Sequence, residues 1–205
     1  MSLLFIFDMD DVLYDYNWRI RMDGMAKLTG LPFTELRRRW WNQDGEWAAE
    51  AGVYATAEEY LAAQEAALGV SIDVEEWVRL RRLGMTPWPE SIAAVERAAE
   101  LGQVTLLTNN GALVSRHLRT LAPELVDVFG DHLFTSSDYF ARKPNPVVFE
   151  RVLEKYGVSA SEAFFADDRP ENIEGAASVG ISAHLFESPA GMRAAIEDFA
   201  GTRTR

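Results

Sequence analysis

Three carboxylates follow the first apolar run of the chain. Asp8, Asp10 and Asp11 come directly after the stretch LLFIF, which has the length and composition of a buried strand. Carboxylates at close range repel one another and each resists leaving water, so this group needs a compensating positive charge. Asp8 and Asp10 are two residues apart, and on an extended backbone their side chains point the same way. This pair is the first candidate for chemistry.

Polar side chains also follow two later apolar runs. Thr108 and Asn109 come after the run VTLL, and Asp167 and Asp168 come after the run AFFA. Lys143 lies in the connecting stretch ARKPNP. In an open α/β sheet, ligands bind beyond the carboxyl ends of the strands. We therefore expect these side chains to meet the first pair at one edge of a sheet.

Oxygen ligands of this kind suit a hard divalent cation such as Mg²⁺. The ion would relieve the repulsion between the carboxylates and would attract a phosphate. The Lys143 ammonium and the Thr108 hydroxyl can then hold phosphate oxygens, with backbone N–H groups as further donors. The residues predict chemistry on a phosphorylated compound. Each motif alone also fits a structural role, since Asp is common in turns and at helix N-termini.

The elements that must position these residues alternate along the chain. The strand-like runs are apolar throughout, which is typical of parallel strands covered on both faces. Helical patterns separate them, and the alternation predicts a doubly wound α/β domain. The runs are residues 3–7, 104–107 and 163–166, with weaker ones at 132–135 and 182–186, and the helical patterns are 90–101, 112–121, 146–156 and 170–179.

The sequence pattern changes between Asp15 and Trp88, where no strand-like run occurs. Alanine-rich helical segments take its place, at residues 18–28, 34–41, 57–68 and 74–83. This pattern predicts a helical insertion after the first strand. The expected division is a core of residues 1–14 and 87–205, with an insertion of residues 15–86.

Composition limits the classes of partner. With 205 residues, 48% of them hydrophobic, the chain can form one domain plus a modest insertion. A net charge of −12 argues against nucleic acid and anionic membranes as partners, and the absence of cysteine excludes disulfides and cysteine nucleophiles. Neither a signal peptide nor a membrane-spanning run is evident, so we expect a cytoplasmic protein, monomeric or homodimeric.

The stretches DMDDV, LLTNNG, RKPNP and FADDRPEN, in this order and spacing, resemble the four motifs of the haloacid dehalogenase (HAD) superfamily of phosphotransferases. The helical insertion resembles the C1-type cap of that superfamily, and the resemblance covers essentially the whole chain. It implies a Rossmannoid α/β core, a parallel sheet flanked by helices, with a small α-helical cap inserted after the first strand.

The resemblance implies catalytic roles residue by residue. Asp8 would be the nucleophile that becomes an aspartyl phosphate, and Asp10 would protonate the leaving oxygen and then activate water. Thr108, Asn109 and Lys143 would bind the phosphoryl group. The dehalogenases that name the superfamily lack an acid at the position of Asp10, because a halide leaves without a proton. The acid therefore favours phosphate-ester hydrolysis.

The resemblance also implies a Mg²⁺ shell. Its ligands would be the carboxylates of Asp8 and Asp168 and the backbone carbonyl of Asp10, with Asp167 as a supporting residue or a direct ligand. Asn172 would orient these carboxylates or the lysine. The family usually has Gly or Asn where this chain has Asp11, a turn position that can require a positive φ.

The expected function is Mg²⁺-dependent hydrolysis of a small phosphorylated metabolite. A sugar phosphate is favoured, because helical-cap relatives with a DDxxEN-like fourth motif resemble sugar-phosphate phosphatases. One alternative is a phosphomutase of the β-phosphoglucomutase type, which returns the phosphate to a sugar. A second, non-enzymatic alternative is a signalling module that accepts phosphate on Asp.

The insertion also holds candidates for substrate recognition. Trp40, Trp41, Trp47 and the arginines at 37–39 could line a pocket for a sugar or another polar body. Such aromatics more often form a helical core, and such arginines more often face solvent. Trp47, beside Gly45, and Trp88, near the end of the insertion, are the two candidates to test first.

Overall fold

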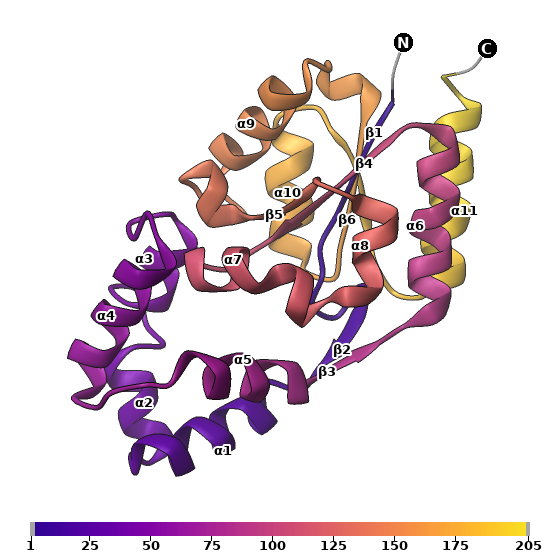
Figure 1. The fold of residues 1–205 in the computed structure, drawn as a ribbon. Helices are drawn as coiled ribbons and strands as arrows, with labels where there is room; N and C mark the ends of the chain where they lie inside the picture. Colours follow the sequence, from indigo (N-terminus) through magenta and orange to yellow (C-terminus); the bar gives the residue numbers. More distant parts are fainter. Residues whose placement is uncertain (1–2, 204–205) are drawn as a thin grey trace.

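The computed structural model describes residues 3–203, so residues 1–2 and 204–205 of the expected core lie outside the described residues. Within this range, five strands form one parallel sheet in the order β5-β4-β1-β6-β7 (Figure 1). Each strand corresponds to one of the predicted apolar runs. They are β1 (Leu4–Phe7), β4 (Gln103–Thr108), β5 (Leu133–Thr135), β6 (Ala163–Asp167) and β7 (Ser182–Leu185).

β1 lies at the centre of the sheet, and all four of its residues are buried. Its last residue, Phe7, pairs with Leu106 of β4 and Ala166 of β6. Because the three strands are parallel, the residues that follow them meet at the same edge. The register therefore places Asp8 next to the polar ends of both neighbours.

Helices cover both faces of the sheet. Phe5 and Phe7 belong to one apolar cluster, and Leu4 and Ile6 belong to another, as expected for alternating side chains. The first face carries α6 (Pro89–Leu101), α7 (Ala112–Leu121), α8 (Val126–Phe129) and α11 (Pro189–Gly201), and the second carries α9 (Pro146–Tyr156) and α10 (Pro170–Ser178).

The chain enters and leaves the helical insertion through a small antiparallel ribbon, β2 (Tyr14–Tyr16) paired with β3 (Met85–Pro87). The expectation of no strand between Asp15 and Trp88 was therefore wrong. A strand of three residues is too short to show a period of two, and β3 ends in a proline, so neither segment gives a sequence signal.

The insertion consists of five helices within the described residues: α1 (Trp18–Thr29), α2 (Phe33–Arg39), α3 (Glu46–Glu50), α4 (Ala57–Leu68) and α5 (Val74–Leu83). They lie to one side of the sheet, beyond the ends of the strands (Figure 1). The five-residue α3 was not predicted, because it spans little more than one turn. Three buried aromatics of the insertion, Trp40, Tyr60 and Trp77, join the apolar cluster of the first sheet face.

None of the helices in residues 3–203 combines the length and the apolar content that crossing a lipid bilayer requires.

Candidate active site

The turn after β1 fixes Asp8 and Asp11. The backbone N–H of Asp8 donates to Ala166 O at 3.0 Å, which extends the pairing of β1 with β6 by one residue. Asp11 has a φ of 58°, and its side chain accepts a hydrogen bond from the Tyr16 N–H at 3.1 Å. The positive φ explains why a residue that tolerates left-handed backbone stands here. Asp11 is thus a turn residue.

Lys143 reaches this turn from the loop before α9. Its Nζ lies 2.9 Å from Asp8 Oδ1 and 2.6 Å from Asp167 Oδ2, and the side chain is fully buried. Burial alone would lower the pKa of Lys143, but the carboxylates of Asp167 and Asp8 outweigh it, so the pKa is raised. The ammonium is therefore charged and bridges the first strand and the fourth motif.

Asn109 holds the backbone of Lys143 from the end of β4. Its Nδ2 donates to Lys143 O, and its Oδ1 accepts from the Lys143 N–H, both at 2.9 Å. Both the Nδ2 and the Oδ1 of Asn109 thus hold the lysine in position. Thr108 is buried next to it, and its Oγ1 accepts a hydrogen bond from Asn110 Nδ2 at 2.9 Å.

The two aspartates after β6 have different surroundings. Asp167 is fully buried and accepts hydrogen bonds from Lys143, from Asn172 Nδ2 at 2.9 and 3.0 Å and from the Arg169 N–H at 2.9 Å. Asp168 is only half-buried and lines a cavity of about 360 Å³. Six other residues for which the sequence predicted a role at the site also line this cavity: Asp8, Asp10, Thr108, Asn109, Lys143 and Asn172.

The carboxylates of Asp8, Asp167 and Asp168 fit a cation. Each offers an oxygen, and these three oxygens lie within 4.8 Å of one another. Burial raises the pKa of Asp8 well above its ordinary value despite the opposing effect of Lys143, and burial together with Asp167 raises the pKa of Asp168 to about 6. The lysine alone therefore leaves negative charge uncompensated, and three carboxylate oxygens are a donor set that suits Mg²⁺.

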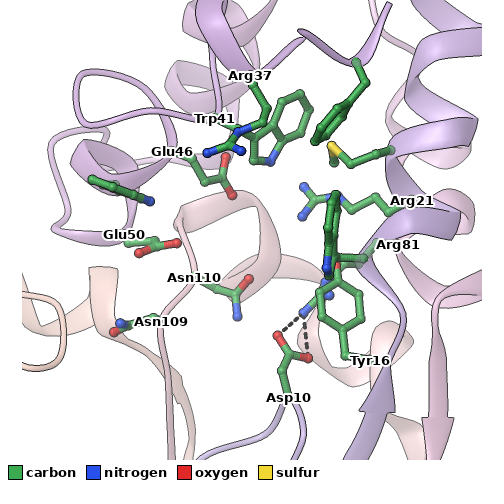
Figure 2. Close-up of a pocket in the computed structure, with 14 residues that line it drawn as sticks. Asp10, Tyr16, Arg21, Arg37, Trp41, Glu46, Glu50, Arg81, Asn109 and Asn110 are labelled. Atoms are coloured by element: carbon green, nitrogen blue, oxygen red, sulfur yellow. Dashed lines mark hydrogen bonds and ion pairs between the residues drawn. The ribbon is translucent and has the colours of Figure 1, made fainter. Parts of the chain in front are cut away.

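The side chain of Asp10 lies outside this cluster. Both of its carboxylate oxygens accept from Arg81 Nη2, at 2.9 and 2.6 Å (Figure 2). Arg81 belongs to α5 of the insertion, is fully buried, and lies 3.6 Å above the ring of Tyr16. The insertion thus holds the second aspartate of the first motif directly.

Arg81 is a site residue that sequence reasoning missed. Its position does carry a signal, since it follows the buried Trp77 by four residues and so lies on the apolar face of α5. An arginine on the buried face of a helix needs an anionic partner, and the first motif supplies one.

A second, larger cavity of about 410 Å³ lies between the insertion and the sheet edge (Figure 2). It shares five lining residues with the first cavity, so the two are continuous at Asp10, Tyr16, Trp47, Glu50 and Asn109. One of its other lining residues, Asn110, comes from the core. The rest come from the insertion: Trp18, Arg21, Met22, Phe33, Arg37, Trp41, Glu46 and Arg81.

Some of the aromatics and arginines predicted to recognise a substrate line the larger cavity, and the others make structural contacts elsewhere. Trp41, Trp47 and Arg37 line the larger cavity. Trp40 is buried and donates from Nε1 to Glu46 at 2.5 Å. Trp88 lines neither of the two cavities, and its ring stacks on Phe186 of the core at 5.8 Å. The two remaining arginines of the run, Arg38 and Arg39, pair with Glu35.

Glu50, which lines both cavities, gives a prediction about stability. We expect Glu50→Gln to stabilise the fold at about pH 8.5 by on the order of 2 kcal/mol, and to have little effect near pH 5. Burial raises the pKa of Glu50 to about 7, although its ion pair with Arg142 opposes this. A carboxyl group whose pKa is higher in the folded state contributes stability at low pH, and that contribution is lost as the pH rises through the folded value.

Urea unfolding of the wild type and the Glu50→Gln variant at the two pH values measures this difference. Glu154→Gln, on the exposed side of α9, is the matched control and should leave both values unchanged. A gain in stability that is the same at both pH values would contradict the assignment of a raised pKa.

The sheet order and the polar site at its strand ends define a Rossmannoid α/β enzyme. A sequence profile described as haloacid dehalogenase-like hydrolase matches residues 3–180. The chain belongs to the haloacid dehalogenase-like hydrolase family, which confirms the resemblance of the four motifs.

Known proteins with similar chains include a phosphatase of Mycobacterium tuberculosis, 32% identical over 188 residues, which are 89% of this chain and 86% of that protein. A HAD family enzyme from Bacteroides thetaiotaomicron, solved with magnesium and inorganic phosphate, has a TM-score of 0.71 at 21% identity and covers 91% of this chain and 95% of its own. A 2-haloacid dehalogenase from Pseudomonas syringae has a TM-score of 0.63 at 25% identity over 91% of this chain and 86% of its own.

Proposed function

We propose that this chain is a Mg²⁺-dependent phosphatase that hydrolyses a small phosphorylated metabolite through an aspartyl phosphate on Asp8. One observation carries the proposal: Asp8, Lys143, Thr108 and Asp168, which come from four motifs far apart in the sequence, line one cavity. The similarity to a mycobacterial phosphatase over most of both chains supports it.

In the first step, an oxygen of Asp8 attacks phosphorus while the bond from phosphorus to the leaving oxygen breaks. Lys143 and the Thr108 hydroxyl hold the phosphoryl oxygens, and the lysine also holds the attacking carboxylate in place. Phosphoryl transfer has a loose transition state and depends mainly on alignment and charge neutralisation. Mg²⁺ bound by Asp8, Asp168, Asp167 and the backbone carbonyl of Asp10 would supply much of that positive charge.

In this proposal, Asp10 carries out the proton transfers. It lines both cavities, so it stands between the phosphoryl site and the space that receives the rest of the substrate. As an acid it gives a proton to the leaving oxygen. As a base it then takes a proton from the water that attacks the aspartyl phosphate, which releases inorganic phosphate and restores Asp8. Arg81 keeps the carboxylate at this boundary.

The alternatives have less support. The similarity to a dehalogenase concerns the fold, whereas Asp10 provides the acid that an alkoxide leaving group needs and a halide does not. The match to a hydrolase family and a phosphatase-named relative favour hydrolysis over a mutase or a signalling module. A phosphatase releases free phosphate, whereas a mutase yields an isomeric sugar phosphate, so product analysis separates these two. The sugar-phosphate preference, the cytoplasmic location and the monomeric or dimeric state stay predictions.

Phosphate release from a panel of phosphorylated metabolites, with Mg²⁺ or with chelator, tests the proposal. We expect chelator to abolish release and Mg²⁺ to restore it. Mg²⁺ should also raise the stability of the wild type, since a ligand at 100 times its Kd adds about 2.7 kcal/mol. Asp168→Asn should weaken this effect, whereas Asp131→Asn, an exposed acid away from the site, should not. Turnover that persists in chelator would contradict the metal assignment.

A further inference from the structure

We propose that the substrate carries a second anionic group, a carboxylate or a second phosphate, and that Arg21 and Arg37 in the larger cavity bind it. This inference rests on the proposed function, because it concerns the part of a phosphate ester that is not transferred. It narrows the substrate to a phosphomonoester whose far end is an oxyanion, whatever skeleton lies between the two groups.

The first observation is that Arg21 is buried with unused donors. The residue is 5% exposed, it lines the cavity, and its Nε and Nη2 atoms have no hydrogen-bond partner in the described part of the chain. A buried N–H group without a partner destabilises the fold, and more so when it belongs to a charged group. A planar guanidinium that is charged at every physiological pH matches a carboxylate or phosphate in a bidentate geometry.

The second observation is how Arg21 is held. Its guanidinium carbon lies 4.6 Å from the ring centre of Trp77 and 5.6 Å from that of Trp41. Contacts with aromatic rings fix the position of the guanidinium without consuming its N–H groups. Figure 2 shows the Arg21 guanidinium extending into the space between Arg37, Glu46 and Arg81. Arg21 is thus preorganised to donate to a ligand.

The third observation is the charge balance of the cavity. Two of its three carboxylates already have cationic partners: Asp10 pairs with Arg81 at 2.6 Å, and Glu50 pairs with Arg142 at 2.6 Å.

The remaining carboxylate, Glu46, accepts hydrogen bonds on Oε2 from Trp40 Nε1 and Tyr60 OH. Arg37, in contrast, forms no ion pair within residues 3–203, and its guanidinium carbon lies 5.9 Å from the ring centre of Phe33 at the cavity wall. Two guanidinium groups therefore face one carboxylate. The lining itself holds three guanidinium groups and three carboxylates, but Glu50 is paired from outside it by Arg142, so one guanidinium group is left without a carboxylate partner. An anion on the ligand would supply that partner.

The aromatic residues that line the cavity indicate the kind of skeleton that the substrate has between its two anionic groups. Tyr16, Trp18, Phe33, Trp41 and Trp47 line the cavity with aromatic rings. Such walls can pack against a flat or partly apolar face of a substrate, and a cavity of about 410 Å³ has the size of ordinary small-ligand sites. The ligand would thus extend from the phosphoryl site past Asp10 toward Arg21.

Two aryl phosphates that differ in one charge test the inference. 4-Carboxyphenyl phosphate and 4-carbamoylphenyl phosphate have the same shape, but only the first has an anion at its far end. We expect the wild type to prefer the carboxylate by at least about 10-fold in kcat/KM, mostly through KM, which corresponds to about 1.4 kcal/mol. The same comparison between 1,4-phenylene bisphosphate and phenyl phosphate tells whether a phosphate is the better anion.

Substitutions then show which residues cause the preference for the carboxylated ester. Arg21→Gln and Arg37→Gln should each reduce the ratio of kcat/KM between the carboxylated and the carbamoyl ester toward one. Arg37 is exposed at the cavity wall, so its variant tests the inference even if Arg21→Gln destabilises the insertion. Arg38→Gln is the matched control, because Arg38 follows Arg37 in the chain but pairs with Glu35 outside the cavity.

The corresponding arylphosphonates cannot be hydrolysed, so their binding tests the second anion site separately from the proposed phosphatase activity. A wild type that hydrolyses both esters equally, or binds both phosphonates equally, overturns the inference but leaves the phosphatase proposal standing. A wild type that binds the carboxylated phosphonate more tightly, with the difference lost in Arg37→Gln, but releases no phosphate from any ester, supports the second anion site and overturns the proposed phosphatase activity.

Discussion

Replacing Asp8 by Asn is expected to reduce phosphate release by at least about 1,000-fold while leaving the fold intact. The amide has nearly the shape of the carboxylate but lacks the nucleophilic oxygen that would form the bond to phosphorus. Lys143 keeps its ion pair with Asp167 at 2.6 Å, so the buried ammonium is not left without a partner. The loss should appear in kcat, because the phosphoryl oxygens keep their other contacts.

Stability provides an independent readout of the same variant. Burial raises the pKa of Asp8 well above its ordinary value, so an ionised Asp8 is costly to the folded state without a metal. In chelator near pH 8, Asp8→Asn should therefore be at least as stable as the wild type, and Mg²⁺ should stabilise it less. Asp15→Asn, on the exposed side of β2, serves as the control with full activity. A soluble Asp8→Asn enzyme with near wild-type turnover would rule out Asp8 as the nucleophile.

The sheet and the residues at its edge could be predicted from the sequence for a physical reason. The strands are short apolar runs that end at polar residues, and parallel strands bring their carboxyl ends together. Asp8, Thr108 and Asp168 each follow such a run by a residue or two, so their convergence follows from topology. Lys143 lies in a loop, and only the order and spacing of the four motifs placed it.

The contacts made by the insertion could not be predicted in the same way. Arg21 and Arg81 lie on helices whose orientation depends on how the insertion packs against the sheet, and their neighbours in sequence do not reveal that packing. The expectation that arginines face solvent concerned residues 37–39 alone, and it describes Arg38, which is exposed beside Glu35. No expectation covered Arg21 or Arg81, which are buried around the larger cavity.

Asn109 shows a different limit. Its place after β4 put it at the edge of the sheet where the strands end. Residue type alone, however, does not tell whether an asparagine there would bind phosphate itself or position another residue such as Lys143. The two hydrogen bonds between its amide and the Lys143 backbone provide that distinction. They make the position of the lysine depend on β4 as well as on its own loop, so two motifs act together on one ammonium.

Replacing Lys143 by Met is expected to abolish activity and to destabilise the fold by about 3–5 kcal/mol in the absence of Mg²⁺. The lysine is fully buried between Asp8 and Asp167, at 2.9 and 2.6 Å, and its removal leaves two buried carboxylates facing each other without a cation. Lys27→Met, on the exposed surface of α1, should change neither quantity and serves as the control.

A second substitution shows whether the cost is electrostatic. Adding Asp167→Asn to Lys143→Met removes one of the stranded charges, so the double variant should recover on the order of 2 kcal/mol in urea unfolding while activity stays lost. If the loss instead came from poorer packing of the methionine, the second change would add its own destabilisation and recover nothing. Recovery in stability without recovery in turnover would thus assign Lys143 two separable roles, one in balancing buried carboxylates and one in holding the phosphoryl group.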